Sequence, residues 1–286
     1  MKRSLVVTLF FPLLPHALQA QTTSQPQTTS QTQTTPQAQT TSPYPVRLLD
    51  RPTTLPRGDA RLDAFTFVNR APGSPTTVAM VIGGGVGITD QLEFGGQVVT
   101  FDIEPSTVFT NPSLYATYSH NLSKTVAIAP TVQVVYPLKT DDPFFVDVGG
   151  ALYANIGSWG YVAFAPTLSV NVRGDDSGTT LSLPVTLMRQ SSDQLNFQFS
   201  SGVGFSRFDP RFGLGRRRDA LDFDDLTVPF SAEAMYTIPH GKKATPLVDL
   251  TLQVQWPQLY TRAPGADTTN ADDWSVQILS SWYLIK

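Results

Sequence analysis

The sequence predicts an all-β fold: an antiparallel transmembrane β-barrel of about 12 strands that follows a disordered N-terminal tract. Three observations carry this prediction. Apolar and polar residues alternate along many segments, the segments are long, and the connections between them are alternately short and long. In the segment 248–256, for example, apolar and polar residues alternate strictly. Such alternation places one set of side chains on each face of a strand, so one face is apolar and the other is small and polar.

The expected strands span most of the chain beyond the N-terminal tract. We place them at about 61–68, 77–88, 91–103, 112–120, 124–138, 144–157, 160–172, 179–189, 194–208, 226–238, 246–258 and 273–285. Most have the roughly 9 to 11 residues that a tilted membrane strand needs, whereas strands of soluble proteins more often have about five or six.

The length of a connection depends on whether the strand before it is odd- or even-numbered. They are mostly brief after even-numbered strands and more variable after odd-numbered ones, where the two longest, 209–225 and 259–272, occur. An antiparallel barrel with both termini in the periplasm has short periplasmic turns and longer outer loops. The alternative architecture, a soluble secreted β-sandwich, gives no reason for loop length to follow parity.

The N-terminal residues predict a signal peptide for export, followed by a flexible tract that tethers or spaces the barrel. Lys2 and Arg3 precede an apolar run that ends near Leu14, and Ala20 supplies a small residue for cleavage, so 1–20 reads as a signal peptide. Residues 21–60 begin with a repeated Gln-Thr-Thr motif and have little apolar surface to bury, so we expect a disordered tract and linker. Anchoring to the cell wall or plugging of the pore is the functional alternative for this tract. The barrel is expected at 61–286.

Composition excludes several classes of function. Charged residues make up 15% of the chain, against roughly 25% in soluble proteins, yet the mean hydropathy of -0.09 is too low for a helical membrane bundle. The absence of cysteine excludes disulfides, thiolate metal sites and a Cys nucleophile. A net charge of -3 gives no reason to expect a nucleic-acid partner.

No catalytic constellation is found, so the chain is not expected to be an enzyme or to carry a cofactor. Of the three histidines, His16 leaves with the signal peptide, and His120 and His240 fall at short turns with no nucleophile or second metal ligand at a useful spacing. The run Gly83-Gly84-Gly85-Val86-Gly87 lacks the Lys-Ser/Thr ending of a phosphate loop. It instead predicts small inward residues or a bulge where the barrel wall bends.

Two short segments resemble a known group of proteins. The hairpin Gly85 to Gly95, with the sequence GVGITDQLEFG, is similar to a periplasmic turn of bacterial outer-membrane β-barrels, including phenol-degradation-pathway transporter families. The last strand, with Gln277, Trp282 and Leu284, resembles the C-terminal signal read by the barrel-assembly machinery, although Leu284 replaces the usual final aromatic residue. The resemblance implies a location in the outer membrane and contact with that machinery. It does not identify a substrate.

The strand pattern also predicts which residues line the lumen. If the apolar set faces lipid, five carboxylates point inward: Asp63, Glu93, Asp147, Glu233 and Asp249. This excess predicts that an open pathway favours cations or neutral polar solutes over anions. The alternative is that these acids pair with neighbouring polar groups in a closed lumen, as in small barrels filled by side chains.

An outer loop concentrates positive charge. It carries four arginines that could bind lipopolysaccharide phosphates bidentately: Arg211, Arg216, Arg217 and Arg218. A solvated loop that balances its own charge with the following aspartates is the plainer interpretation. The sequence therefore leaves two functions open, a passive or gated channel for small solutes and a structural or adhesive barrel with a closed lumen.

Overall fold

The fold is seen in a computed structural model. It describes residues 44–70, 76–104, 108–109, 111–138, 144–172, 179–206, 225–241, 245–263, 266–269 and 271–285. The described strands are β1 (Ala60–Arg70), β2 (Thr77–Gly87), β3 (Leu92–Glu104), β4 (Val108–Phe109), β5 (Ser113–Tyr118), β6 (His120–Asn121), β7 (Val126–Val135), β8 (Phe145–Asn155), β9 (Gly160–Phe164), β10 (Thr167–Asn171), β11 (Thr179–Gln190), β12 (Leu195–Ser206), β13 (Asp225–Pro239), β14 (Pro246–Ala263), β15 (Ala266–Thr269) and β16 (Trp274–Leu284).

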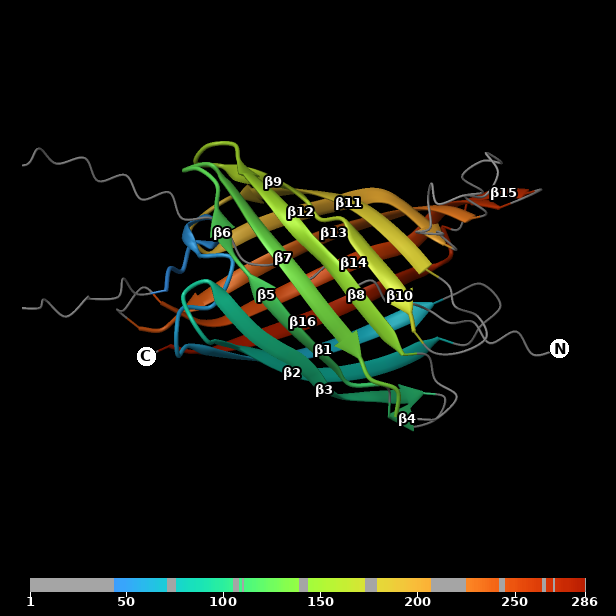
Figure 1. Cartoon of the computed structure of the whole chain (residues 1–286), viewed down its shortest axis with the longest axis horizontal. Helices are drawn as coiled ribbons and strands as arrows, with labels where there is room; N and C mark the ends of the chain where they lie inside the picture. The colour runs from blue at the N-terminus through green and yellow to red at the C-terminus, as the bar shows by residue number, and fades with distance from the viewer. Residues whose placement is uncertain are drawn as a thin grey trace, which may run out of the picture.

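These strands form one closed antiparallel barrel (Figure 1). β5 with β6, and β9 with β10, each act as one interrupted strand, while β4 and β15 pair only with β3 and β14 among the described strands. The wall therefore has 12 strands, as the sequence predicts. The first strand closes the barrel by pairing with the last over its whole length, from Ala60 opposite Leu284 to Arg70 opposite Trp274.

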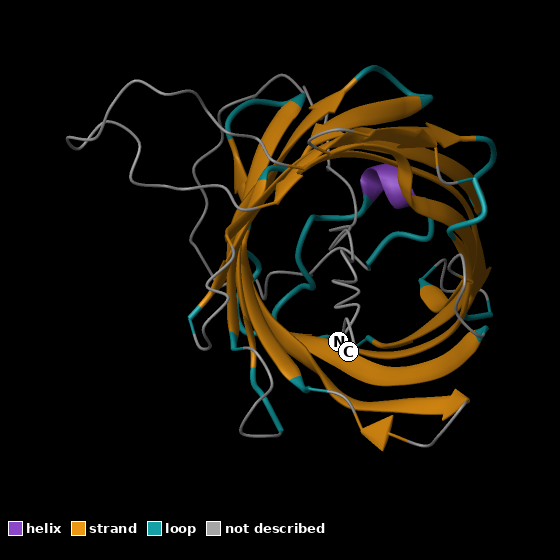
Figure 2. Cartoon of the chain, turned by 90° about the vertical axis from the view of Figure 1, so that its right-hand side faces the viewer, coloured by secondary structure: helices purple, strands orange, loops and turns teal. Residues whose placement is uncertain are grey.

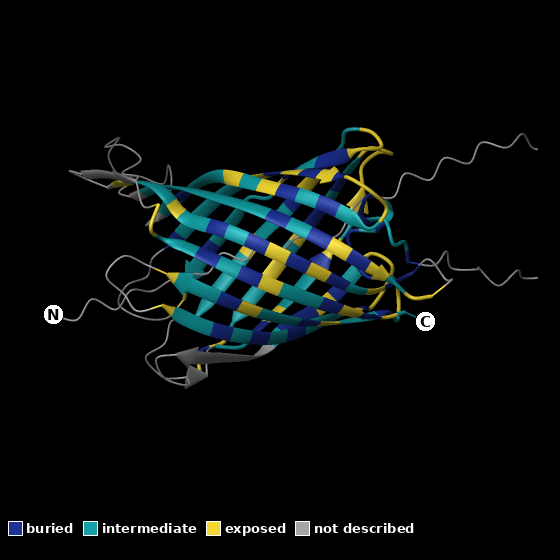
Figure 3. Ribbon diagram, turned by 180° about the vertical axis from the view of Figure 1, so that it is seen from behind, coloured by how far each residue is buried: buried dark blue, intermediate teal, exposed yellow. Residues whose placement is uncertain are grey.

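The two faces of the wall differ as the alternation predicts. Along β14, Leu250 and Leu252 are exposed on the outside, while Asp249, Thr251 and Gln253 are buried inside. Figure 3 shows the same checkered pattern over neighbouring strands. Exposed apolar side chains on every side of a closed barrel form a surface suited to lipid. Among the described residues, no helix has the length and apolar character needed to cross a membrane.

The first strands depart from the simple pattern. Phe67 points inward and is buried against Ala79 and Val81, with Phe65 packed beside them. The pairing of β2 with β3 shifts register between Ile82 and Gly83, which is a bulge. This confirms that the glycine run marks an irregularity of the wall. The inner face of β1 therefore changes along the strand, from the charged Arg61 and Asp63 to the apolar Phe65 and Phe67.

Residues 44–59 correct the expected boundary of the disordered tract, which we place at 21–60. They are described, they enclose a short 3-10 helix, η1 (Leu48–Asp50), and four of their apolar side chains are almost completely buried. The view along the barrel in Figure 2 shows this segment inside the wall. Residues 1–43 lie outside the described residues. We call residues 44–59 the lumen segment.

Candidate functional site

The lumen segment lies at the end of the barrel where the short turns and the end of β16 meet (Figure 1). Its Arg47 donates a hydrogen bond to the carbonyl of Ser158 in the turn between β8 and β9. Further along, the hydroxyls of Thr53 and Ser119 are in hydrogen-bond contact at the junction of β5 and β6. The segment is thus attached to different parts of the wall, and we call this the short-turn end.

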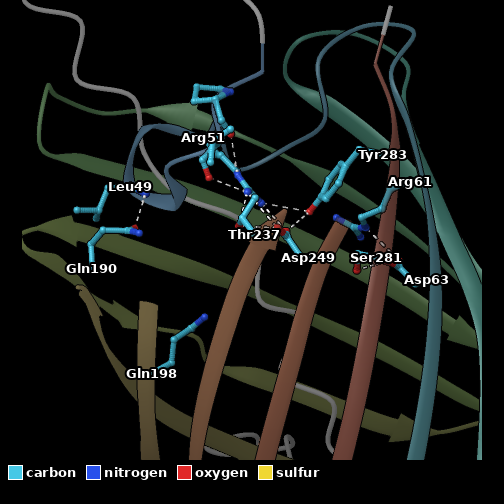
Figure 4. Close-up of polar contacts among 12 residues, drawn as sticks. Leu49, Arg51, Arg61, Asp63, Gln190, Gln198, Thr237, Asp249, Ser281 and Tyr283 are labelled. Carbon is cyan, nitrogen blue, oxygen red and sulfur yellow. Dashed lines mark hydrogen bonds and ion pairs between the residues drawn. The ribbon is translucent and has the colours of Figure 1, made fainter. Parts of the chain in front are cut away.

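Arg51 is the main polar anchor of the segment (Figure 4). Its side chain is completely buried, and its two terminal nitrogens donate to the two carboxylate oxygens of Asp249 on β14, at 2.5 and 3.1 Å. One of them also donates to Thr237 Oγ1 at 2.9 Å, and the other approaches Tyr283 Oη at 3.3 Å. A bidentate pair of this kind fixes orientation as well as position.

The same guanidinium holds the segment's own backbone in shape. Arg51 Nε donates to the carbonyl of Pro45 at 2.9 Å, and a terminal nitrogen donates to that of Val46 at 2.8 Å. The rings of Tyr44 and Tyr283 lie 5.6 and 5.5 Å from the guanidinium carbon, within cation–π range. Burial acts to lower the pKa of Arg51, but the Asp249 carboxylate and the other partners raise it, and the pKa ends above its usual value. The anchor therefore stays charged.

An apolar patch holds the other side of the segment. Leu48 and Leu49 are buried in one cluster with small residues of β7, β8 and β9 and with larger ones of β8, β9, β11 and β13: Ala127, Ala129, Ala151, Ala163, Tyr153, Tyr161, Met188 and Met235. The alanines leave the room that the leucines fill. The backbone of Leu49 is also tied to the wall, since its N–H donates to Gln190 Oε1 at 3.3 Å.

The hairpin Gly85 to Gly95, whose sequence resembles a turn of outer-membrane barrels, is the second site at which the wall binds the lumen segment. We call this site the second dock. Glu93 Oε2 accepts the N–H of Leu55 at 3.0 Å, and the carbonyl of Asp90 accepts the hydroxyl of Thr54 at 3.1 Å. Gly87 exchanges backbone hydrogen bonds with Gly58 and Asp59. A Cβ at Gly87 would lie only 2.0 Å from the carbonyl oxygen of Pro56, so the close approach of the segment requires glycine here.

Arg61 neutralises two of the predicted lumen carboxylates. It lies near the start of β1 and pairs with Asp63 at 3.0 Å and with Glu93 at 3.5 Å. Tyr115 Oη donates to Glu93 at 2.7 Å, and Ser281 Oγ donates to Asp63 at 2.6 Å. Together with the pairing of Asp249 and Arg51, this means that three of the five predicted acids have cationic partners at the short-turn end.

The other two acids are bonded to neutral groups. Asp147 on β8 accepts the hydroxyl of Ser169, and Glu233 on β13 accepts Gln198 Nε2 at 3.1 Å. All five residues therefore face the interior, but they do not form one group. The four arginines of the outer loop, Arg211, Arg216, Arg217 and Arg218, lie outside the described residues.

From the sequence, plugging of the pore is an alternative for the whole tract 21–60, and residues 44–59 are not singled out as an ordered segment. A signal was present: the repeat ends at Thr41, and Tyr44, Leu48, Leu49 and Leu55 then follow within a short stretch. Such apolar residues do not suit a free linker. The part of the chain that the structure describes contains no group of three residues able to hold a metal ion. His120 and His240 are both exposed at the short-turn end.

Comparison with solved structures agrees with this architecture. An outer membrane channel from Pseudomonas putida F1 has a TM-score of 0.53 and 14% identity, with 81% of this chain and 97% of that chain covered. The KdgM porin has a TM-score of 0.49 and 8% identity, with 78% and 98% covered. No family model matches the sequence, and no curated protein is significantly similar to it.

The fold is therefore that of a bacterial outer-membrane β-barrel. Closure by β1 and β16, 12 long strands and an apolar outer face define this class. In this barrel, a buried N-terminal segment is anchored by Arg51 and docked on the Gly87–Glu93 hairpin.

Proposed function

We propose that the protein is an outer-membrane channel for small solutes and that the lumen segment is its gate. The observation that carries the proposal is the anchor of that segment: its guanidinium bridges the segment to β13, β14 and β16. A permanently closed barrel needs only packed wall side chains. Here a separate piece of chain, attached through a compact set of polar contacts, occupies the short-turn end.

In this proposal the short-turn end faces the periplasm. The expected signal peptide at 1–20 and the position of both barrel ends support that orientation, because outer-membrane barrels have short periplasmic turns. The tract before residue 44 then lies in the periplasm, and the long loops with the outer arginine cluster face lipopolysaccharide. The fold shared with an outer membrane channel supports transport over catalysis.

The direct test is to lock the segment with a disulfide. Thr53→Cys with Ser119→Cys joins two residues whose hydroxyls are in contact, and the absence of native cysteine removes any background. In planar bilayers we expect low conductance from the oxidised variant and recovery after reduction. Arg51→Ala should conduct more than wild type. Arg57→Ala, which removes an exposed arginine of the same segment, is the matched control and should behave as wild type.

The alternative, a structural or adhesive barrel with a closed lumen, is favoured by the complete burial of Arg51 and of the apolar cluster around Leu48. It predicts no conductance from wild type, from the reduced variant or from Arg51→Ala. Heat-modifiable gel mobility shows that each variant is folded. Equal conductance of the oxidised and reduced forms would instead leave a channel without this gate.

A further inference from the structure

The inner wall carries a polar surface that forms no described hydrogen bond with the lumen segment. On β12, β13, β14 and β16, four long polar side chains stand side by side, because Gln198 pairs with Glu233, Glu233 with Gln253, and Gln253 with Gln277 in the register of the sheet. All four point inward, with exposed fractions between 3% for Gln198 and 8% for Glu233. We call these four residues the amide row.

A second polar row runs beside the first on the same strands. Moving toward the long-loop end, the next inward positions are Ser200, Ser231, Gln255 and Ser275. Ser275 is 2% exposed, and its hydroxyl has no hydrogen-bond partner among the described residues. A buried hydroxyl without a partner is unfavourable, and a bound molecule that supplies one removes that penalty.

The amide row is itself only partly satisfied. Tyr161 Oη donates to Gln198 Oε1 at 3.5 Å, and Gln198 Nε2 donates to Glu233 Oε1 at 3.1 Å, which orders one half of the row. The amides of Gln253 and Gln277 form no hydrogen bond with another side chain that the structure describes. Each amide offers both donors and an acceptor. The half of the row without described side-chain hydrogen bonds lies beside Ser275 and next to Phe67 on β1.

The chemistry of the two rows selects the class of ligand. Neither row contains Lys or Arg, so neither offers a positive charge to an anion. An apolar solute would leave the amides and the serine hydroxyls without partners, which costs affinity. A hydroxyl group both donates and accepts, as the Gln and Ser side chains do. The surface is therefore complementary to a neutral molecule that carries several hydroxyls.

We propose that this wall is a binding site for neutral polyols and sugars, with Gln253, Gln277 and Ser275 as its main contacts. The proposal rests on the proposed function, since the solute must enter the lumen to reach the site. It deepens that function by naming the class of solute that the channel recognises. Recognition would lie between the long loops and the lumen segment, because Gln253 and Gln277 follow Asp249 and Ser281 in the direction of the long loops.

The test measures block of ion current by a neutral solute. The full-length chain carrying Arg51→Ala is placed in planar bilayers, and sorbitol is added at rising concentration. Triethylene glycol, which is neutral and has few hydroxyls, is the comparison solute. We expect a saturable loss of current with sorbitol and none with triethylene glycol. Adding Gln253→Leu and Gln277→Leu should weaken the block about tenfold, as expected for the loss of two hydrogen-bonding groups.

The outcomes separate the two proposals. Absence of ion current in every variant contradicts the channel itself. Normal ion current without a saturable sorbitol effect, or with an equal effect of triethylene glycol, overturns the polyol site alone. Gln194→Leu is the matched control, because this half-buried glutamine accepts a hydrogen bond from Tyr236, which is exposed on the outer surface, and belongs to neither polar row. If the double variant does not fold, the comparison of the two solutes still decides the question.

Discussion

Arg51 and Asp249 form a bidentate ion pair inside the barrel, with nitrogen–oxygen distances of 2.5 and 3.1 Å, although 198 positions separate them in the sequence. Arg51 belongs to the lumen segment and Asp249 to a wall strand. Both side chains are almost fully buried, at 0% and 2% exposure. The pair is therefore the point at which the segment is most strongly attached to the wall.

Removing Arg51 should release the lumen segment while the barrel stays folded. Arg51→Ala leaves Asp249 buried without its cation, which typically costs about 3–5 kcal/mol. Amide hydrogen exchange is the measurement: the N–H groups of Leu49, Leu55 and Gly58, each hydrogen bonded in the docked segment, should lose protection. Arg57→Ala should keep it. Unchanged exchange in Arg51→Ala would show that the pair does not hold the segment.

A single methyl group at Gly87 should disturb the second dock. In Gly87→Ala the new Cβ would lie 2.0 and 2.4 Å from the carbonyl oxygens of Pro56 and Leu55, which are backbone atoms of the segment. In Gly85→Ala it meets the side-chain ends of Glu93 and Tyr115 at 2.7 and 2.8 Å, and these ends can move. In planar bilayers we expect Gly87→Ala to have a higher open probability than wild type. Gly85→Ala should raise the open probability less. The reverse order would contradict the dock.

The apolar contact of Leu48 should stabilise the docked lumen segment independently of the Arg51–Asp249 pair. Leu48→Ala removes a side chain that is 1% exposed and should weaken docking by about 2–5 kcal/mol, the usual range for such a cavity. Limited proteolysis reports the effect, because trypsin cleaves an extended, accessible chain more readily and Arg47 is held to Ser158 while the segment is docked. Faster cleavage is expected in Leu48→Ala. Leu247→Ala, which shortens an exposed leucine of β14, should leave the cleavage rate unchanged.

The local alternation of residues predicted the strands but not the ordered lumen segment inside the barrel. The range expected for β14 began at its true first residue because Val248 to Trp256 alternate, and alternation is a property of neighbouring residues. The pairing of Arg51 with Asp249 depends on how distant parts of the chain meet, which no local period encodes. The five carboxylates lie on the inner face of the wall, because each follows the period of its own strand. Their neutralisation by Arg51 and Arg61 needed the three-dimensional arrangement.

Ion selectivity should depend on Arg61. The sequence alone predicts a lumen that favours cations. In the structure, Arg61 pairs with both Asp63 and Glu93, so these two acids should contribute less to that preference. Arg61→Gln leaves these two carboxylates without their cation and should shift the reversal potential toward stronger cation preference. Arg189→Gln, which changes an exposed arginine of β11, makes the same net-charge change and should not alter it.

Removing an acid that has no cationic partner among the described residues should have the opposite effect to Arg61→Gln and weaken the cation preference. Replacing Glu233, which is bonded only to Gln198 among the described side chains, by Gln removes a negative charge from the wall and should lower cation preference. The effect should shrink at high salt, because added ions screen charges in a water-filled pathway. A wild-type preference for anions, or equal shifts in Arg61→Gln and Arg189→Gln, would show that these inward charges do not set selectivity.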